Sequence, residues 1–190
     1  MSLTEDKIYQ YIKQFGTLLE SQLLEMMAPI TEERLSRTLH KMWKKNMIKR
    51  GGPDNAYIML NGGSDNVDMI YVDCIWILLA HATCEDDITT AYRGREFLKL
   101  SYFSREKQNS YNMFFVGSEN DYPKVSFINN KYSNEVDEDM VETTRFIFIS
   151  DSVDVLEKMP LNKFSFPYLS IQLDFTQNGR YKKPEIKIIE

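Results

Sequence analysis

Hydrophobic residues recur every three or four positions through the first quarter of the chain, the spacing of a helix with one buried face. Three helices are predicted, and the first two, residues 6–15 and 19–27, end at Gly16 and before Pro29. The third begins at Thr31, whose hydroxyl can cap free amides, and ends near Asn46. The predicted buried faces are Ile8, Tyr11, Ile12 and Phe15, then Leu19, Leu23, Leu24 and Met27, then Leu35, Leu39, Met42 and Trp43.

Two short apolar runs follow the third helix. Residues 47–50 and 56–60 are predicted strands, and the Gly, Pro, Asp and Asn residues of 51–55 favour the turn of a hairpin. Residues 61–66, Asn-Gly-Gly-Ser-Asp-Asn, have the composition of a linker. We therefore predict a first domain over 1–60, a linker over 61–66 and a second domain over 67–190.

The second domain is predicted to be a mixed α/β, β-rich domain, which makes the whole chain α+β. Residues 67–82 are apolar on almost every side, so they form either a buried helix or a pair of buried strands. A single later helix begins near Asp151 and ends before Pro160, between two strands of a βαβ-like unit. Aromatic and β-branched residues predict strands at 96–103, 111–116, 124–128, 145–149, 168–175 and 185–189.

The last two strands predict a hairpin with a polar face. If Asn178-Gly179 forms a two-residue turn, Asp174 faces Lys183 and the apolar residues largely share the other side. On the polar face, Asp174, Glu185 and Lys187 imitate the carboxylates and lysine of a metal-dependent nuclease, in which the acids hold Mg²⁺. The simpler interpretation is the solvent face of an edge hairpin, which Pro184 favours.

Charge is distributed unevenly along the chain. The 190 residues carry a formal net charge of -5, yet residues 1–60 hold nine Lys and Arg against seven Asp and Glu, which leaves -7 for the remainder. Residues 31–50 alone hold seven basic and two acidic side chains. This confined basic charge predicts one local contact with a polyanion, not a wrapped surface. The cations opposite the apolar stripe of the third helix are Arg34, Arg37, Lys41, Lys44 and Lys45.

The first third of the chain resembles a bacterial winged helix-turn-helix domain. The resemblance rests on the order of three helices and a hairpin, and on Phe15-Gly16-Thr17-Leu18, Ser21-Gln22-Leu23, Arg34-Leu35 to Leu39 and the Lys49-Arg50 strand. In DNA-binding members the third helix enters the major groove and the wing lies against the backbone. The resemblance implies that Arg34, Arg37, Thr38 and Lys41 lie in the groove, and that Lys44, Lys45, Lys49 and Arg50 contact phosphates.

The chain as a whole is similar to the replication-relaxation family of mobile-element proteins, on the apolar helix at 72–79 and the strand at 145–149 with its following helix. The similarity implies control of replication, transfer or transcription of a mobile element. We predict a non-enzymatic regulator that binds double-stranded DNA, with the second domain used for dimerisation or partner contact. The alternative is a protein-interaction module, such as an inhibitor that binds its target through the acidic second domain.

Other site chemistry is sparse. His81 and Cys84, with Cys74 upstream, could suggest zinc or a thiol nucleophile, but the short paired ligand spacings are missing and packing roles are favoured. No catalytic residue, metal ligand or cofactor is predicted. The absence of an apolar run of roughly 20 residues and of a secretory signal predicts a cytoplasmic chain with no membrane partner.

Overall fold

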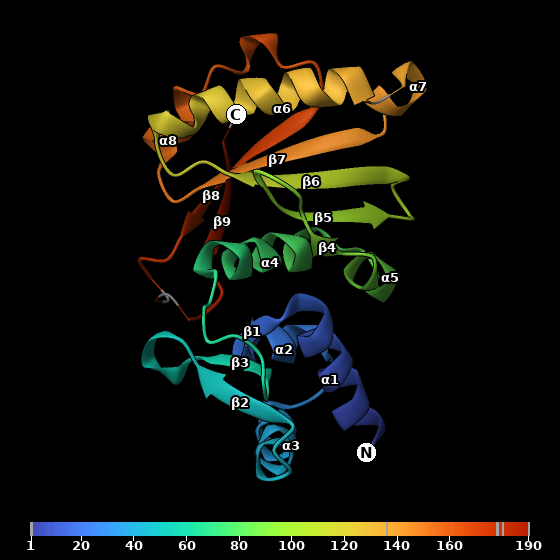
Figure 1. The fold of residues 1–190 in the computed structure, drawn as a ribbon, viewed down its shortest axis with the longest axis vertical. Helices are drawn as coiled ribbons and strands as arrows, with labels where there is room; N and C mark the ends of the chain where they lie inside the picture. Colours follow the sequence, from blue (N-terminus) through green and yellow to red (C-terminus); the bar gives the residue numbers. More distant parts are fainter. Residues whose placement is uncertain (1, 136, 178, 180, 190) are drawn as a thin grey trace. The chain divides into compact units, whose positions relative to one another are not determined.

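A computed structural model describes residues 2–135, 137–177, 179 and 181–189, and its elements are labelled in Figure 1. The residues fall into two compact units. Unit 1 comprises residues 1–79 and 180–183, and unit 2 comprises residues 80–179 and 184–190. Helices and strands occur in both units, so the chain belongs to the α+β class, as the sequence pattern predicts.

Unit 1 follows the predicted order of helices and a hairpin. Its strands form an antiparallel sheet in the order β1-β3-β2, and β1 is a short strand that the sequence pattern does not predict. Residues of α4 through Leu79 also belong to this unit. The elements are α1 (Leu3–Phe15), β1 (Thr17–Leu19), α2 (Glu20–Met26), α3 (Glu32–Lys44), β2 (Ile48–Gly51), η1 (Pro53–Asn55), β3 (Tyr57–Leu60) and α4 (Met69–His81).

The first helix starts earlier than residue 6, where the apolar spacing predicts it. The Ser2 hydroxyl accepts a hydrogen bond from the Glu5 amide at 3.2 Å, and the Ser2 amide donates to the Glu5 carboxylate at 3.0 Å. This reciprocal capping box satisfies two amides at the end of the helix and sets its start at Leu3. Hydrophobic spacing alone misses the first turn because that turn is held by polar groups.

The boundary between the units differs from the predicted linker at 61–66. Gln22 Nε2 donates a hydrogen bond to the carbonyl of Val72 in α4 at 2.7 Å, inside unit 1. The sheet of unit 1 has an apolar face that needs a cover, and α4 provides part of it. A helix that sequence order places in the second domain therefore completes the core of the first. The buried cluster consists of Leu19, Tyr57, Met59, Val72 and Trp76.

Unit 2 is built on a mixed sheet in the order β4-β5-β6-β7-β8-β9. Strands β6, β7 and β8 are parallel neighbours, and the remaining pairs are antiparallel. The predicted βαβ-like unit is present as β7, α8 and β8. The elements are α5 (Glu85–Thr89), β4 (Tyr92–Arg93), β5 (Leu98–Ser104), β6 (Asn109–Phe115), η2 (Glu119–Asp121), α6 (Tyr122–Glu135), α7 (Glu138–Val141), β7 (Thr144–Ser150), α8 (Val153–Glu157), η3 (Leu161–Lys163), β8 (Tyr168–Asp174) and β9 (Glu185–Ile189).

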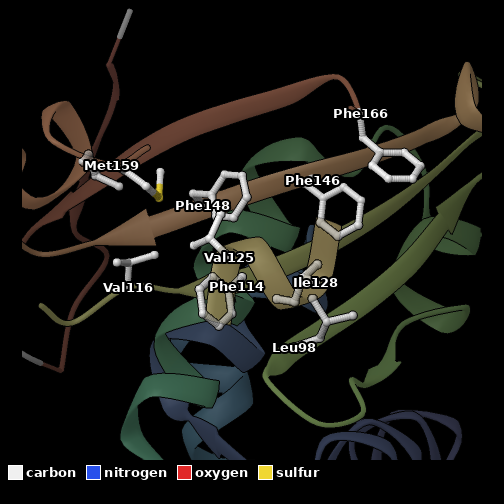
Figure 2. Packing of buried hydrophobic residues seen from close by; sticks show 10 residues of the cluster. Leu98, Phe114, Val116, Val125, Ile128, Phe146, Phe148, Met159 and Phe166 are labelled. Carbon is white, nitrogen blue, oxygen red and sulfur yellow. The ribbon is translucent and has the colours of Figure 1, made fainter. Parts of the chain in front are cut away.

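The predicted strand at 124–128 is wrong, because these residues lie within α6. Val125 and Ile128 are three positions apart, so a helix turns both toward the sheet. There they pack with Phe114, Phe146 and other apolar residues of the strands (Figure 2). A short apolar run is compatible with the residue spacing of a strand or of a helix. Here the helix forms because it covers the aromatic face of the sheet.

The register of the last hairpin differs by two residues from the predicted one. Asp174 lies opposite Glu185, not opposite Lys183. The predicted turn at Asn178-Gly179 includes Asn178, which lies outside the described residues. Tyr181 instead packs within unit 1, where its ring centroid lies 5.9 Å from that of a tyrosine in β3. Because residues 181–183 make contacts in unit 1, the pairing with β8 begins only at Glu185, the first residue of β9.

None of the helices within the described residues combines the length and the apolar character that crossing a bilayer requires.

Candidate nucleic-acid interface

Helix α3 is an exposed cationic helix held by a narrow apolar stripe. The Thr31 hydroxyl accepts a hydrogen bond from the Arg34 amide at 3.3 Å, which confirms the predicted cap. Leu35, Leu39 and Met42 are buried and attach the helix to unit 1. Acidic residues occupy its first turn and Lys41 and Lys44 its last turn, an arrangement that suits the helix dipole.

The predicted groove and phosphate residues lie at or near the surface of unit 1. Five cations of α3 and its C-cap are exposed, and Arg50 of β2 is exposed as well. Thr38 and Lys49 are partly buried, and the Thr38 hydroxyl donates to the Arg34 carbonyl at 2.8 Å. The exposed α3 set is Arg34, Arg37, Lys41, Lys44 and Lys45.

Half of the eight predicted residues are engaged by carboxylates of the same chain. Arg37 pairs with Glu33 one turn earlier, and Arg50 pairs with Glu20 of α2. Lys49 Nζ lies 2.8 Å from the carboxylate of Asp65. The fourth of these cations is Lys45, whose partner is described below. Over the described ranges 2–135, 137–177, 179 and 181–189, no ion pair involves Arg34, Lys41 or Lys44, so these three carry uncompensated charge.

Lys45 differs from the other cations because its partner is buried. Its Nζ lies 2.9 Å from Oε1 and 3.0 Å from Oε2 of Glu5, a residue of α1 with little solvent exposure. The hydrogen bond from Lys45, together with that from the Ser2 amide, holds the pKa of Glu5 below its usual value. Lys45 therefore joins α3 to α1, and a phosphate contact would have to break that link.

Trp43 is not part of the buried stripe, in contrast to the prediction. Its side chain is 56% exposed, and its ring centroid lies 5.8 Å from that of His40. Eight residues after Leu35, Trp43 is displaced by roughly 80° around the helix from the stripe centre, which moves it to the flank. The prediction places Trp43 in the stripe because it is a large apolar residue four positions after Leu39. Its angular position around the helix, however, indicates the flank.

The exposed tryptophan forms one wall of a groove between α3 and the hairpin. The groove has a volume of about 420 Å³ and lies wholly within unit 1. Its polar rim comes from the helix on one side and from β2 and η1 on the other. The lining residues are Ser36, Leu39, His40, Trp43, Ile48, Lys49, Arg50, Asn55 and Ile58.

The polar residues of the last hairpin do gather, but as a closed ion network. Lys187 Nζ lies 2.9 Å from Asp174 Oδ2 and 3.2 Å from Glu185. The other Asp174 oxygen accepts hydrogen bonds from the Thr176 hydroxyl at 2.6 Å and the Thr176 amide at 2.9 Å. Bonds from Thr176 and then Lys187 hold the pKa of Asp174 well below its usual range. Lys187 thus bridges the two carboxylates, and the oxygens of Asp174 are already bonded to Lys187 and Thr176 of this chain.

His81, Cys84 and Cys74 do not form a common site. Cys74 is buried in α4, whereas Cys84 is exposed and its thiol donates to Asp87 Oδ1 at 3.6 Å. The His81 ring instead meets the edge of Tyr111, with ring centroids 6.1 Å apart. Among the residues that the structure describes, no group of three or more His, Cys, Asp or Glu side chains is placed to hold a metal ion.

The chain gives no significant match to a protein-family model, to a curated protein or, by its fold, to a solved structure.

Proposed function

We propose that unit 1 binds double-stranded DNA through α3 and the β2–β3 hairpin, and that the protein acts as a DNA-binding regulator. The observation that carries the proposal is the uncompensated charge of Arg34, Lys41 and Lys44 on the exposed side of α3. In a protein of net charge -5, such a surface attracts a polyanion only locally.

The size of α3 suits a major-groove contact. Its 13 residues span about 20 Å at 1.5 Å per residue, and the major groove is about 12 Å wide, enough to admit a helix. The hairpin follows α3 directly, as in the winged helix-turn-helix domains that the sequence resembles. We assign Arg34, Arg37, Thr38 and Lys41 to the groove side and Lys44 to phosphate contact.

The ion pairs divide the remaining predicted phosphate contacts into two kinds. Lys49 and Arg50 lie on β2 and pair with carboxylates that are at least partly exposed, so DNA phosphates can replace these partners. Lys45 is assigned a structural role, because withdrawing it would leave the carboxylate of Glu5 buried without its cation. A dimer would extend the short site that one α3 can contact, and such a regulator would act in the cytoplasm.

The test compares two triple variants that remove equal charge. Arg34→Gln with Lys41→Gln and Lys44→Gln is measured against Lys13→Gln with Lys163→Gln and Lys182→Gln, all exposed cations elsewhere. Binding to a pool of random-sequence duplexes is followed by fluorescence anisotropy from low to physiological salt. On random-sequence duplexes, where matched bases are rare, we expect all three α3 cations to contact phosphates. Each lost phosphate contact reduces the slope of log K against log salt by about 0.9, so the α3 variant should lose up to about 3.

The control triple should keep the slope of the wild type. The proposal is refuted if the wild type does not bind duplex at low salt, or if both triples weaken binding equally. Equal weakening would mean that only the net charge matters.

A protein-interaction module is the second candidate, favoured by the apolar groove beside Trp43. Trp43→Ala separates the two functions. Under the DNA proposal this variant retains most duplex binding and its full salt slope, because it removes no charge. If Trp43→Ala leaves DNA binding unchanged but abolishes binding of a protein partner, the groove beside Trp43 is assigned to protein interaction.

A further inference from the structure

A second cavity, distinct from the α3 surface, lies wholly within unit 2. It has a volume of about 350 Å³, in the range of small-molecule sites, and it lies beside the first residues of the parallel strands β7 and β8. Alternation along β7 turns Arg145 and Ile147 away from Phe146 and Phe148, which pack in the cluster beneath α6. The cavity therefore opens on the face of the sheet opposite α6.

Among the residues that the structure describes, two cations and no acidic side chain line this cavity. Lys107 Nζ donates to the carbonyl of His81 at 3.4 Å. The Arg145 guanidinium donates to the carbonyls of Glu142 and Thr144, the latter at 3.2 Å. These backbone contacts orient the two side chains without neutralising them, and within the described part of the chain neither cation forms an ion pair. The cavity is therefore a site of positive potential in an acidic protein.

The walls of the cavity are apolar and aromatic. Tyr111 is buried and held rigidly, since its ring stacks on Tyr102 with centroids 4.9 Å apart and planes at 11°. Lys107 Nζ lies 5.9 Å from the centre of the same ring, so the charge and the flat surface are adjacent. Leu169 faces the cavity from β8, whereas the neighbouring Tyr168 turns its ring toward Phe148 and Phe164 on the other face of the sheet. Flat and apolar walls beside two cations suit an organic anion better than a bare inorganic one.

His81 adds a group that can form hydrogen bonds. Burial, and then the neighbouring charge of Lys107, lower the pKa of the His81 imidazole below its usual value. At neutral pH the ring is therefore uncharged and offers one N–H donor and one acceptor nitrogen. It contributes polarity to the cavity wall, while the charge comes from the lysine and the arginine.

We propose that this cavity binds a small planar organic anion, with Lys107 and Arg145 holding its anionic group and Tyr111 contacting its aromatic body. The site is independent of the DNA contact proposed for unit 1. It would make the protein a ligand-binding one, and the ligand class is an aromatic carboxylate or an aromatic phosphate ester.

The test uses 2-naphthoate and 2-naphthyl phosphate as the two probes and 2-naphthamide as the uncharged analogue, each titrated into the full chain by calorimetry. We expect saturable binding of at least one anionic probe, and binding of 2-naphthamide at least about tenfold weaker than that of 2-naphthoate if the latter binds. Backbone amide shifts in the NMR spectrum should concentrate at residues 107–111, 145–147 and 168–169. Inorganic phosphate alone should bind more weakly than either aromatic probe that binds.

The variants separate the cavity from general charge. Lys107→Gln with Arg145→Gln should weaken binding of the anion by about tenfold or more, whereas Lys163→Gln with Lys158→Gln, an equal charge change elsewhere in unit 2, should leave it within about twofold. Matching thermal unfolding curves establish that both variants are folded. Absence of saturable binding by both anions up to about 5 mM would overturn the proposal. So would equal affinity of the double variant and the control.

Discussion

Asp87 supports the strongest stability prediction, because its carboxylate organises the start of unit 2. The side chain is 0% exposed. It accepts hydrogen bonds from the Thr83 amide and hydroxyl, each at 3.0 Å, from the Ser104 hydroxyl at 3.1 Å and from the Arg105 amide at 3.3 Å. One carboxylate thus joins the turn before α5 to the end of β5.

The cost of Asp87→Asn follows from the donors that it leaves without a matching acceptor. An amide keeps one acceptor oxygen but turns an NH₂ group toward the other donors. The Thr83 and Ser104 donors all meet Oδ2, so an asparagine oxygen at that position keeps them, and the NH₂ group then faces the Arg105 amide at Oδ1. A donor left without its acceptor costs about 1–3 kcal/mol, and the bonds that remain are no longer made to a charged group, so we expect a loss of about 2–3 kcal/mol in the free energy of unfolding of unit 2.

Asp86→Asn is the matched control, since it makes the same chemical change one residue earlier. Asp86 is exposed and its partner Arg105 Nη1 lies 2.7 Å away at the surface, so its loss should cost less than about 1 kcal/mol. Both tryptophans, Trp43 and Trp76, lie in unit 1, so their fluorescence does not report the unfolding of unit 2. Urea unfolding is therefore followed by far-ultraviolet circular dichroism, with hydrogen exchange of the β5 and β6 amides.

The same prediction has a pH dependence of defined sign. Burial opposes ionisation of Asp87, but the hydrogen bonds from Thr83, Ser104 and Arg105 outweigh it and hold the pKa below the usual value. The ionised carboxylate therefore contributes stability above the unfolded pKa of about 3.9, and this contribution is lost as the pH falls through the lower folded pKa. The difference between wild type and Asp87→Asn should be full at neutral pH and shrink below about pH 4. Equal stability of the Asp87 and Asp86 variants, or a pH-independent difference, would refute the reasoning.

Two further predictions concern unit 1. Trp43→Ala should cost less than about 1 kcal/mol because its side chain is exposed, whereas Met42→Ala one residue earlier should cost about 2–5 kcal/mol by leaving a cavity, as measured by urea unfolding; similar costs would mean that Trp43 is part of the core. Gly52→Ala should destabilise the hairpin by about 1–3 kcal/mol, since φ is 68° and a Cβ would approach Tyr57 to 2.7 Å. Gly62→Ala, with φ of 85° but nothing within 4 Å of its Cβ, should cost only the backbone strain, so equal losses in thermal unfolding would contradict the steric argument.

The ends of α3 and the hairpin after it are predictable from sequence because their causes are local. Thr31 caps the amide three residues later, and the turn between β2 and β3 uses Gly52, Asp54 and Asn55 at positive φ. Each of these conformations depends on a residue type and its immediate neighbours. The identity of the cationic face of α3 is local in the same sense, since a helix fixes which residues share a side.

The wrong predictions concern segments whose local sequence is compatible with two structures, so that contacts with distant segments determine which one forms. The run at 124–128 satisfies either a strand or a helix, and the aromatic face of the sheet selects the helix. The register of β8 and β9 depends on contacts that residues 181–183 make inside unit 1. Trp43 lies at the edge of its stripe, where helical spacing leaves both burial and exposure open.

Local sequence was sufficient to predict an α+β chain, a cationic helix beside a hairpin and a second region rich in strands. Which of those cations remain uncompensated depends on Glu5 and Glu20, which come from other helices and whose distance from Lys45 and Arg50 no periodicity reveals. The cavity of unit 2 is a still clearer case, since Lys107 and Arg145 come from separate parts of the chain. The hydrogen bonds that define helices and turns join residues a few positions apart, so local sequence predicts them. Ion pairs and cavities form between side chains that are distant in the sequence, and only tertiary packing brings these side chains together.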